Sequence, residues 1–206
     1  WTPLVSSSAP PAATAYALVW AASTTERLTR NVVGAWINGN LQLWMRVYVD
    51  AASYGTYLLT AANMISVIVG YTGAPGIEYM NRYGDNYTVE DARTGLAGWH
   101  DIGLQWTPAT GSAIIYLDGV GGSPLSVEKG ALDDATLYAV EVGNRSYKLA
   151  ALKWSHTLTW TATAASADTM TDILFDLPLS EGSGATTTDS TGTAWTIPAG
   201  VTWEAY

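Results

Sequence analysis

The stretch Trp99–Val120, WHDIGLQWTPATGSAIIYLDGV, decides the fold. In its first half, large apolar residues alternate with small or polar ones, which is the period-two pattern of a half-buried strand: Ile102, Leu104 and Trp106. Residues 107–111 form a turn cluster with proline and glycine, and a strand rich in branched and aromatic side chains follows at 113–117. Asp118-Gly119 is a dipeptide that type I′ hairpins prefer. The stretch therefore predicts a β-meander.

These residues also resemble the central hairpin of concanavalin A-like, laminin-G-like jelly rolls. The likeness lies in a Trp-His strand start, a Trp-Thr-Pro-x-Thr-Gly turn and a strand ending Tyr-Leu-Asp-Gly-Val. Residues 177–192, LPLSEGSGATTTDSTG, are similar to the family's "EGSG…DSSG" segment, and 201–203 to the Trp strand that follows it. The resemblance implies an all-β jelly-roll β-sandwich. It implies little about activity, because this fold hosts lectins, glycosidases, adhesion modules and virion proteins.

Composition limits the classes of partner. Hydrophobic residues make up 48% of the 206 residues, enough for a core between two sheets, while charged residues make up only 13%. A net charge of −9 without a basic run disfavours nucleic acid and anionic membranes. No apolar run reaches the roughly 20 residues of a membrane helix. A surface of Thr, Ser, Ala, Gly and Tyr suits an extracellular protein, secreted or on a cell or virion surface.

The chain divides into an extended N-terminal arm, 1–14, and a single sandwich, 15–206. Pro10-Pro11 favours a polyproline-like backbone in the arm. The alternation over 41–49 predicts a strand, and 54–60 with 64–71 predicts a hairpin. One short helix is expected near 166–174, with Ser166 as its cap. Cysteine is absent, so the fold has no disulfide.

The order of the C-terminal segment, 177–206, departs from the family pattern. In the family that the sequence resembles, the Glu-Gly-Ser-Gly segment and its Trp strand open a domain, whereas here they close the chain. Either the strands are circularly permuted and the segment completes its own sandwich, or the segment is donated to a neighbouring subunit by β-strand addition. The arm could equally be the donated segment. Both alternatives stay open.

The aromatic content is unusual, with ten tryptophans and twelve tyrosines against one phenylalanine. On the strand 41–49, Trp44 and Tyr48 face away from the leucine and methionine side chains. We expect this stripe to be a sugar platform or the contact surface of an assembly. Rim tyrosines such as Tyr83 and Tyr87 could also stack on sugar, whereas Trp106 and Trp154 are expected in the core.

Catalysis is not predicted. A glycosidase of this fold needs two carboxylates a few ångströms apart, and the family signature Glu-x-Asp-x-x-Glu on one strand is missing. The adjacent pairs Glu90-Asp91 and Asp133-Asp134 would point to opposite faces of a strand. No Gly-x-Ser-x-Gly elbow is present, and His100 is interpreted as a structural residue beside Trp99.

No cofactor is expected, and metal ligands stay unassigned. The resemblance implies that calcium could bind, with candidates Asp85, Asn81, Asn86 and Asp118, but Asp and Asn also stabilise turns without a metal. Two N-glycosylation sequons fall in predicted loops, at Asn86 and Asn144. They matter only in a host that glycosylates secreted proteins.

Two functional hypotheses follow. The first is a non-enzymatic structural subunit of an extracellular fibre, filament, surface layer or phage particle, which assembles with itself by exchanging a terminal strand or arm. Its interface would contain Trp1, Pro3, Leu4, Val5, Trp44, Tyr48, Trp195 and Trp203. The alternative is a carbohydrate-binding lectin or adhesion module, with glycans as partners and Trp44 and Tyr48 stacking on sugar.

Overall fold

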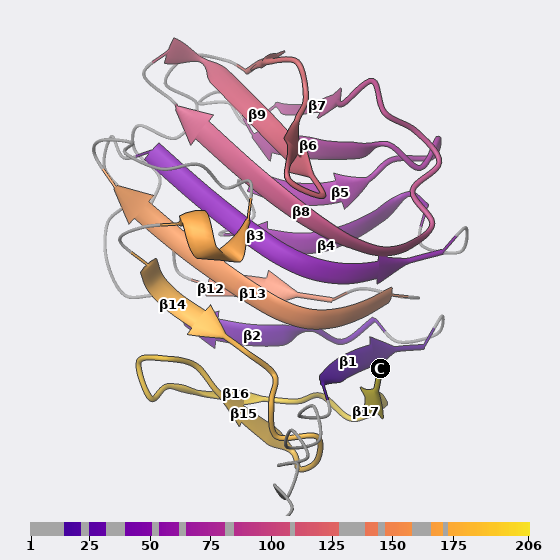
Figure 1. The fold of residues 1–206 in the computed structure, drawn as a ribbon, viewed down its shortest axis with the longest axis vertical. Coiled ribbons are helices and arrows are strands. Elements are labelled where there is room, and N and C mark those ends of the chain that lie inside the picture. The colour runs from indigo at the N-terminus through magenta and orange to yellow at the C-terminus, as the bar shows by residue number, and fades with distance from the viewer. Residues whose placement is uncertain are drawn as a thin grey trace, which may run out of the picture.

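The computed structural model describes residues 15–21, 25–31, 40–50, 54–61, 65–80, 85–107, 110–127, 139–143, 147–157, 166–170 and 173–206. They form two antiparallel β-sheets that face each other (Figure 1). Sheet A has the order β10-β9-β8-β3-β13-β1-β17, with β11 paired to β9 and β14 to β13, and sheet B has the order β15-β16-β2-β12-β4-β5-β6-β7. The all-β jelly-roll sandwich expected from the sequence is therefore confirmed.

The elements have the following bounds in chain order: β1 Tyr16–Trp20, β2 Leu28–Asn31, β3 Asn40–Val49, β4 Thr56–Ala61, β5 Ile65–Val69, β6 Pro75–Met80, β7 Asn86–Glu90, β8 Gly98–Thr107, β9 Ser112–Leu117, β10 Val120–Gly121, β11 Leu125–Ser126, β12 Ala139–Val142, β13 Tyr147–Thr157, the 3-10 turn η3 Ala167–Thr169, β14 Ile173–Leu177, β15 Thr186–Thr188, β16 Ala194–Thr196 and β17 Val201–Ala205.

The hairpin predicted within Trp99–Val120 is β8–β9, and its register is regular from Ile102↔Leu117 to Thr107↔Ser112. The turn into β10 places both Asp118 and Gly119 at positive φ, 51° and 82°. This is the backbone that a type I′ turn requires, so the predicted meander is confirmed.

The core lies between the sheets. All five alternate residues of β3 on that side are 0–1% exposed: Leu41, Leu43, Met45, Val47 and Val49. Trp106 is fully buried, as predicted, whereas the side chain of Trp154 lies outside the described part of the structure. Tyr147 in sheet A donates its hydroxyl to the Leu58 carbonyl of sheet B at 2.9 Å, which ties the two sheets together.

The helix expected near 166–174 is much shorter than its sequence pattern suggests. Only Ala167–Thr169 form a 3-10 turn, and Ile173 begins strand β14, which pairs with β13. Met170 is buried, whereas Ile173 is 37% exposed. The run Ile-Leu-Phe favours a strand because branched and aromatic side chains pack well on a sheet, and β13 offers it a partner.

The C-terminal segment pairs with its own chain. Strand β17 joins β1 over five residue pairs, from Tyr16↔Ala205 to Trp20↔Val201, and β16 contacts β2 at Thr196↔Thr29. The segment thus supplies edge strands to both sheets, as the lower part of Figure 1 shows. The arm 1–14, with Trp1, Pro3, Leu4 and Val5, lies outside the described residues, so its part in an interface stays a prediction.

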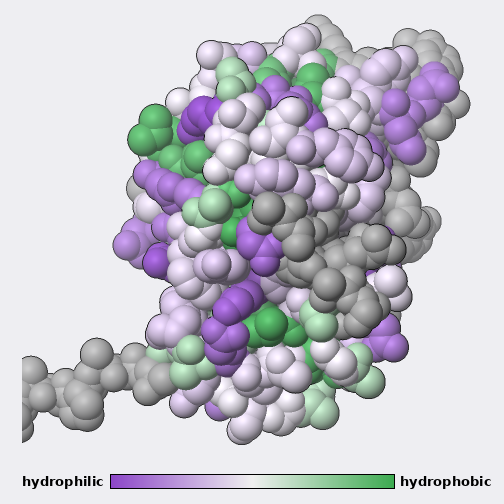
Figure 2. Space-filling model, turned by 90° about the vertical axis from the view of Figure 1, so that its right-hand side faces the viewer, coloured by the Kyte–Doolittle hydropathy of each residue, from purple (hydrophilic) through white to green (hydrophobic). Residues whose placement is uncertain are grey.

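The visible surface matches the low charge of the sequence. Figure 2 shows a face of mostly pale side chains of intermediate hydropathy, with purple and green residues scattered among them. In the described part of the chain, no helix has the length and apolar character that crossing a bilayer demands.

Candidate functional site

A groove lies on the outer face of sheet B, over strands β4 to β7. Its larger pocket has a volume of about 320 Å³, and its lining includes Tyr57, Gly70, Tyr71, Glu78, Thr88 and Glu90. A smaller pocket of about 240 Å³ has Tyr57 and Glu78 in common with it and adds Arg27, Ser66 and Asn86. We call the two pockets together the β4–β7 groove.

Strand register explains why polar side chains gather in this groove. Glu78 pairs with Ser66 on one side and with Thr88 on the other, so these three side chains form one row across β5, β6 and β7. Because successive side chains of a strand point to opposite faces, Ile77 enters the core while Glu78 faces outward. Asp91, next to Glu90, is buried and bonded to Arg93.

Two glycines form the floor beneath Glu90. A Cβ atom at Gly70 would lie 2.0 Å from Glu90 Oε1, and one at Gly76 would lie 3.2 Å from Glu90 Cγ. The Glu90 side chain therefore rests on bare backbone inside the larger pocket. Within the described residues, Glu90 makes no hydrogen bond or ion pair.

The two loops that contain Tyr54-Gly55 and Tyr71–Gly73 contact each other at the rim of the groove. The Tyr71 ring covers Gly55, whose added Cβ would lie 2.6 Å from it, and the Tyr54 ring covers Gly73 in the same way at 2.5 Å. Both glycines have positive φ, 78° and 73°. Tyr71 is nevertheless 88% exposed, so its outer face is free to stack on a ligand.

Tyr57 and Glu78 form the polar centre that both pockets share. The Tyr57 hydroxyl donates to the Glu78 carboxylate, with oxygen distances of 3.0 and 3.1 Å. Burial raises the pKa of Tyr57 above its usual value, and the Glu78 carboxylate raises it further. The phenol thus stays protonated at neutral pH and keeps donating. Arg27, which lines the smaller pocket, is paired with Glu141.

This arrangement suits a polyhydroxylated ligand. An exposed tyrosine face can stack on the apolar face of a sugar ring, and nearby carboxylates and hydroxyls can bond the hydroxyl groups of the sugar. A pocket with an aromatic face and a few fixed polar groups is the usual form of a small-molecule site.

A second aromatic surface lies on sheet A, and it includes Tyr48. Trp99 meets the Tyr48 ring edge-on at 5.7 Å and stacks on Tyr206 at 4.4 Å. Lys148 lies over the Tyr48 ring at 5.1 Å and is paired with Glu204. We call Tyr48, Trp99 and Tyr206 the Tyr48 cluster; Tyr48 is half-buried and Tyr206 is 45% exposed.

The prediction of an exposed stripe on β3 is wrong at Trp44. Its side chain is only 6% exposed, and Gln42 on the same outer face is 1% exposed. The turn η3 lies in front of sheet A in the view of Figure 1, and Met170, which follows it, is itself buried. The outer face of β3 is therefore not an open surface at Gln42 and Trp44.

The two predicted interface tryptophans of the C-terminal segment hold the segment to its own chain. Trp195 is fully buried and its ring nitrogen donates to Asp189 Oδ2 at 2.9 Å, so its place at a subunit interface stays a prediction. Trp203 is half-buried, packs against the core and donates to the Gly184 carbonyl at 3.1 Å. A role for Trp203 in assembly stays a prediction.

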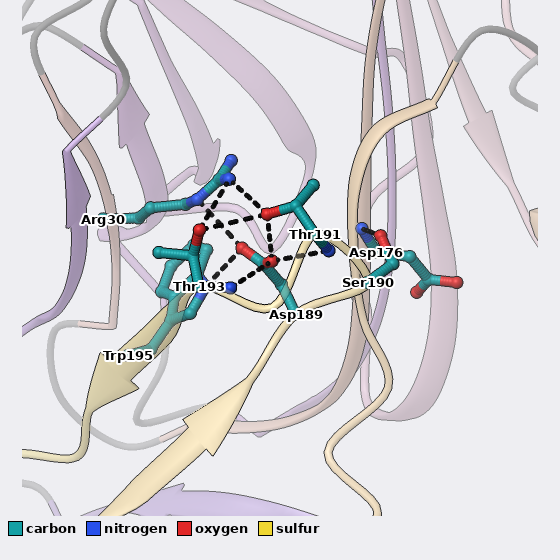
Figure 3. Close-up of polar contacts among 7 residues, drawn as sticks. All are labelled: Arg30, Asp176, Asp189, Ser190, Thr191, Thr193 and Trp195. Carbon is teal, nitrogen blue, oxygen red and sulfur yellow. Dashed lines mark hydrogen bonds and ion pairs between the residues drawn. The ribbon is translucent and has the colours of Figure 1, made fainter.

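The aspartate of the Asp-Ser-Thr-Gly turn is the centre of a buried network (Figure 3). Asp189 Oδ1 accepts from the backbone nitrogen and hydroxyl of Thr191 and from the Thr193 nitrogen. Its other oxygen accepts from Trp195 and pairs with Arg30 of β2. The Asp-Ser-Thr-Gly part of segment 177–192 therefore has a structural role, because Asp189 links its own turn to Trp195 and to Arg30 of β2.

The candidate metal ligands occupy turn and strand positions. Asp118 accepts from the Asp101 nitrogen at 2.9 Å, and His100 Nδ1 lies 2.8 Å from its other oxygen, so both residues order the β9–β10 turn. Among the described residues, no group of three or more His, Cys, Asp or Glu could hold a metal ion. Asn81 lies outside the described residues, and Asp85 is exposed.

The two sequons differ in what the structure describes. Asn86 is exposed but begins strand β7 and lines the smaller pocket, so the predicted loop is wrong there. Asn144, like Tyr83, lies outside the described residues. Tyr87 is 46% exposed and stacks on Tyr79 at 5.6 Å.

Sequence reasoning missed the groove residues Tyr57, Tyr71, Glu78 and Glu90. The search for paired carboxylates was confined to single strands, whereas the two glutamates come from neighbouring strands. The signal that could have found them is the alternation of β6 and β7, which places each glutamate on the outer face, combined with the pairing of these strands.

Solved structures place the fold in a class. No family model matches this sequence, and no curated protein matches it either. Among similar structures, a protein from Bacteroides ovatus with a provisional carbohydrate-binding description has a TM-score of 0.63 at 13% identity, covering 95% of this chain and 61% of its own. A native heptameric SAP-like pentraxin from Limulus polyphemus has a TM-score of 0.51 at 15% identity, covering 68% and 75%.

A third similar structure is the binding domain of botulinum neurotoxin DC, solved in complex with rat synaptotagmin II. Its TM-score is 0.52 at 9% identity, covering 69% of this chain and 39% of that one. At these identities the likeness establishes the fold alone. The chain has a jelly-roll β-sandwich of the lectin-like kind, consistent with the concanavalin A-like architecture that the sequence resembles.

Proposed function

We propose that this protein is a non-enzymatic carbohydrate-binding module of the lectin or adhesion type, acting outside the cell. The observation that carries the proposal is the exposed ring of Tyr71 at the rim of a pocket that Glu78, Thr88 and Glu90 also line. We also propose that the module belongs to the concanavalin A-like, laminin-G-like family and needs no cofactor.

The groove supplies both parts of sugar recognition. Tyr71 lies over Gly55 and exposes its other face to solvent, where the apolar face of a sugar ring can stack. Glu78 is held by Tyr57, which fixes two acceptor oxygens where a sugar hydroxyl can reach them. Similar structures described as binding proteins support the same reading.

The structural-subunit hypothesis has less support. Strand β17 pairs with β1 of the same chain, and this pairing fills the edge that strand exchange would use. Trp44 and Trp195 are buried in their own chain rather than presented to a neighbour. We therefore place glycan binding first and self-assembly second.

A glycan array tests the proposal. Wild-type protein, Tyr71→Ala and Tyr48→Ala are applied to neutral, amino and acidic glycans, with and without calcium. We expect wild-type binding that Tyr71→Ala weakens at least tenfold and Tyr48→Ala leaves unchanged, because Tyr48 belongs to the other aromatic surface. Loss only in Tyr48→Ala would move the site to the Tyr48 cluster, and absence of binding to every glycan would refute the proposed function.

A further inference from the structure

We infer that the β4–β7 groove selects saccharides with free amino groups over neutral and acidic ones. This inference rests on the proposed function and names the ligand class of the same site. It is carried by the charge, pairing and position of the two groove carboxylates.

Within the described residues, neither carboxylate of the larger pocket has a cationic partner. The hydrogen-bond partner of Glu78 is the Tyr57 hydroxyl, a neutral donor. Within the described residues, Glu90 has no bonded partner. In the pairing of β6 with β7, Gly76 lies opposite Glu90 and Glu78 lies opposite Thr88. The two glutamates therefore occupy neighbouring rows on the same face of sheet B. An ammonium group between these rows meets two anions.

Among the described residues that line the groove, the one positive charge already has a partner. Arg27 lines the smaller pocket but pairs with Glu141, so the two charges cancel. The chain as a whole carries a net charge of −9. A uronate, sulfate or sialate would bring a second anion to a negative pocket, and like charges at short range repel.

The pocket geometry places an amino group beside Glu90 while the sugar ring lies on Tyr71. Glu90 lies over Gly70 and Gly76, and no side chain from either residue screens its carboxylate. The larger pocket, about 320 Å³, includes both Glu90 and Tyr71 in its lining. A charge-assisted hydrogen bond from an ammonium to a carboxylate is stronger than a neutral one, so this contact decides between an amine and its acetylated form.

Three oligosaccharides of equal length test the inference by calorimetry: a glucosamine pentamer, the corresponding N-acetylglucosamine pentamer and a galacturonate pentamer. Titrations are run at about pH 5.5, where sugar amines are largely protonated. We expect the glucosamine pentamer to bind at least tenfold more tightly than its acetylated form, and the galacturonate pentamer not to bind. Raising the salt should shrink the preference.

Variants separate site binding from general attraction between opposite charges. Glu90→Gln should abolish the preference for the amine, whereas Asp168→Asn, which removes one exposed charge from η3, should keep it. Tyr71→Ala should weaken both the amine and the acetylated pentamer. A preference that survives Glu90→Gln, or amine binding that survives Tyr71→Ala, would overturn the inference.

The two proposals fail in different ways. Equal binding of the amine and acetylated pentamers would refute selectivity while supporting a sugar site in the groove. Tighter binding of the galacturonate pentamer would likewise refute only the selectivity. Absence of binding to all three and to the glycan array would refute the proposed function as well.

Discussion

Arg30 Nε lies 2.9 Å from Asp189 Oδ2, and the Asp189 side chain is fully buried. The pair joins β2 to the turn between β15 and β16, two segments far apart in the sequence (Figure 3). Trp195 bonds the same carboxylate, so one side chain orders the turn, a core tryptophan and the contact with the neighbouring strand. The C-terminal hairpin is therefore held to sheet B by a buried ion pair as well as by its short strand pairing.

Replacing Asp189 should destabilise the fold strongly. Asp189→Asn leaves the Arg30 charge in a mostly buried position without its anion, and breaking a buried pair in this way costs about 3–5 kcal/mol. We expect the free energy of unfolding, measured by urea denaturation, to fall by about that amount. Asp176→Asn is the matched control, because its pair with Lys153 at 3.3 Å is partly exposed and such pairs contribute under about 1 kcal/mol. Equal losses in the two variants would contradict a special role for Asp189.

The same carboxyl should make stability depend on acidity. Burial by itself raises the pKa of Asp189, but hydrogen bonds from Thr191 and Trp195 outweigh it and lower the pKa below its ordinary value of 3.8. A lowered pKa means that folding favours the ionised form, so this contribution is present above the ordinary pKa and is lost as pH falls through the folded one. The urea concentration at the midpoint of unfolding of the wild type should therefore decrease as the pH is lowered below about 4. In this pH range the urea midpoints of the wild type and of Asp189→Asn should become more similar. A difference in midpoint that does not depend on pH would contradict the assignment of this pH dependence to Asp189.

Gly143 should tolerate no side chain. An added Cβ would lie 2.2 Å from the Trp20 ring, and the residue has φ of +100°. Trp20 stacks on Tyr147 at 5.0 Å and cannot move without disturbing the core. We expect Gly143→Ala to cost the backbone strain of about 1–2 kcal/mol together with about 1–3 kcal/mol of overpacking. Thermal unfolding against Gly192→Ala provides the control, since Gly192 has φ of +82° but nothing within 4 Å. Equal melting temperatures would show that the Trp20 contact is harmless.

Local pattern predicted those parts of the fold that local chemistry determines. Alternation and turn residues gave the β8–β9 hairpin, and Asp118-Gly119 adopts the positive φ angles that its turn type needs. The alternation of residue types along β3 also predicted which of its side chains face the core and which face outward. It could not show that the Trp44 side chain on the outer face is buried, because burial there depends on tertiary contacts that the strand pattern does not contain.

The groove required information that no single strand contains. Glu78 and Glu90 lie on one face only because β6 and β7 pair in a particular register. A shift of that register by one residue would turn one set of side chains to the core. The free face of Tyr71 depends equally on the meeting of two loops at Gly55 and Gly73. Such pairings are set by the tertiary structure, so the sequence pattern predicted a sugar platform at Trp44 and Tyr48 and did not indicate this groove.

Moving the Glu90 carboxylate without removing its charge should also remove amine selectivity. In Gly70→Ala, the new Cβ would lie 2.0 Å from Glu90 Oε1, and the flexible glutamate must leave the pocket floor. Because the displaced group is the far end of a side chain, we expect a stability change of under about 1 kcal/mol by thermal unfolding. Affinity for the glucosamine pentamer should fall to that of the acetylated form. In the double variant Gly70→Ala/Glu90→Gln, the second substitution should add no further loss, since both act on the same contact. Additive losses would mean that Glu90 does not act from the floor of the groove.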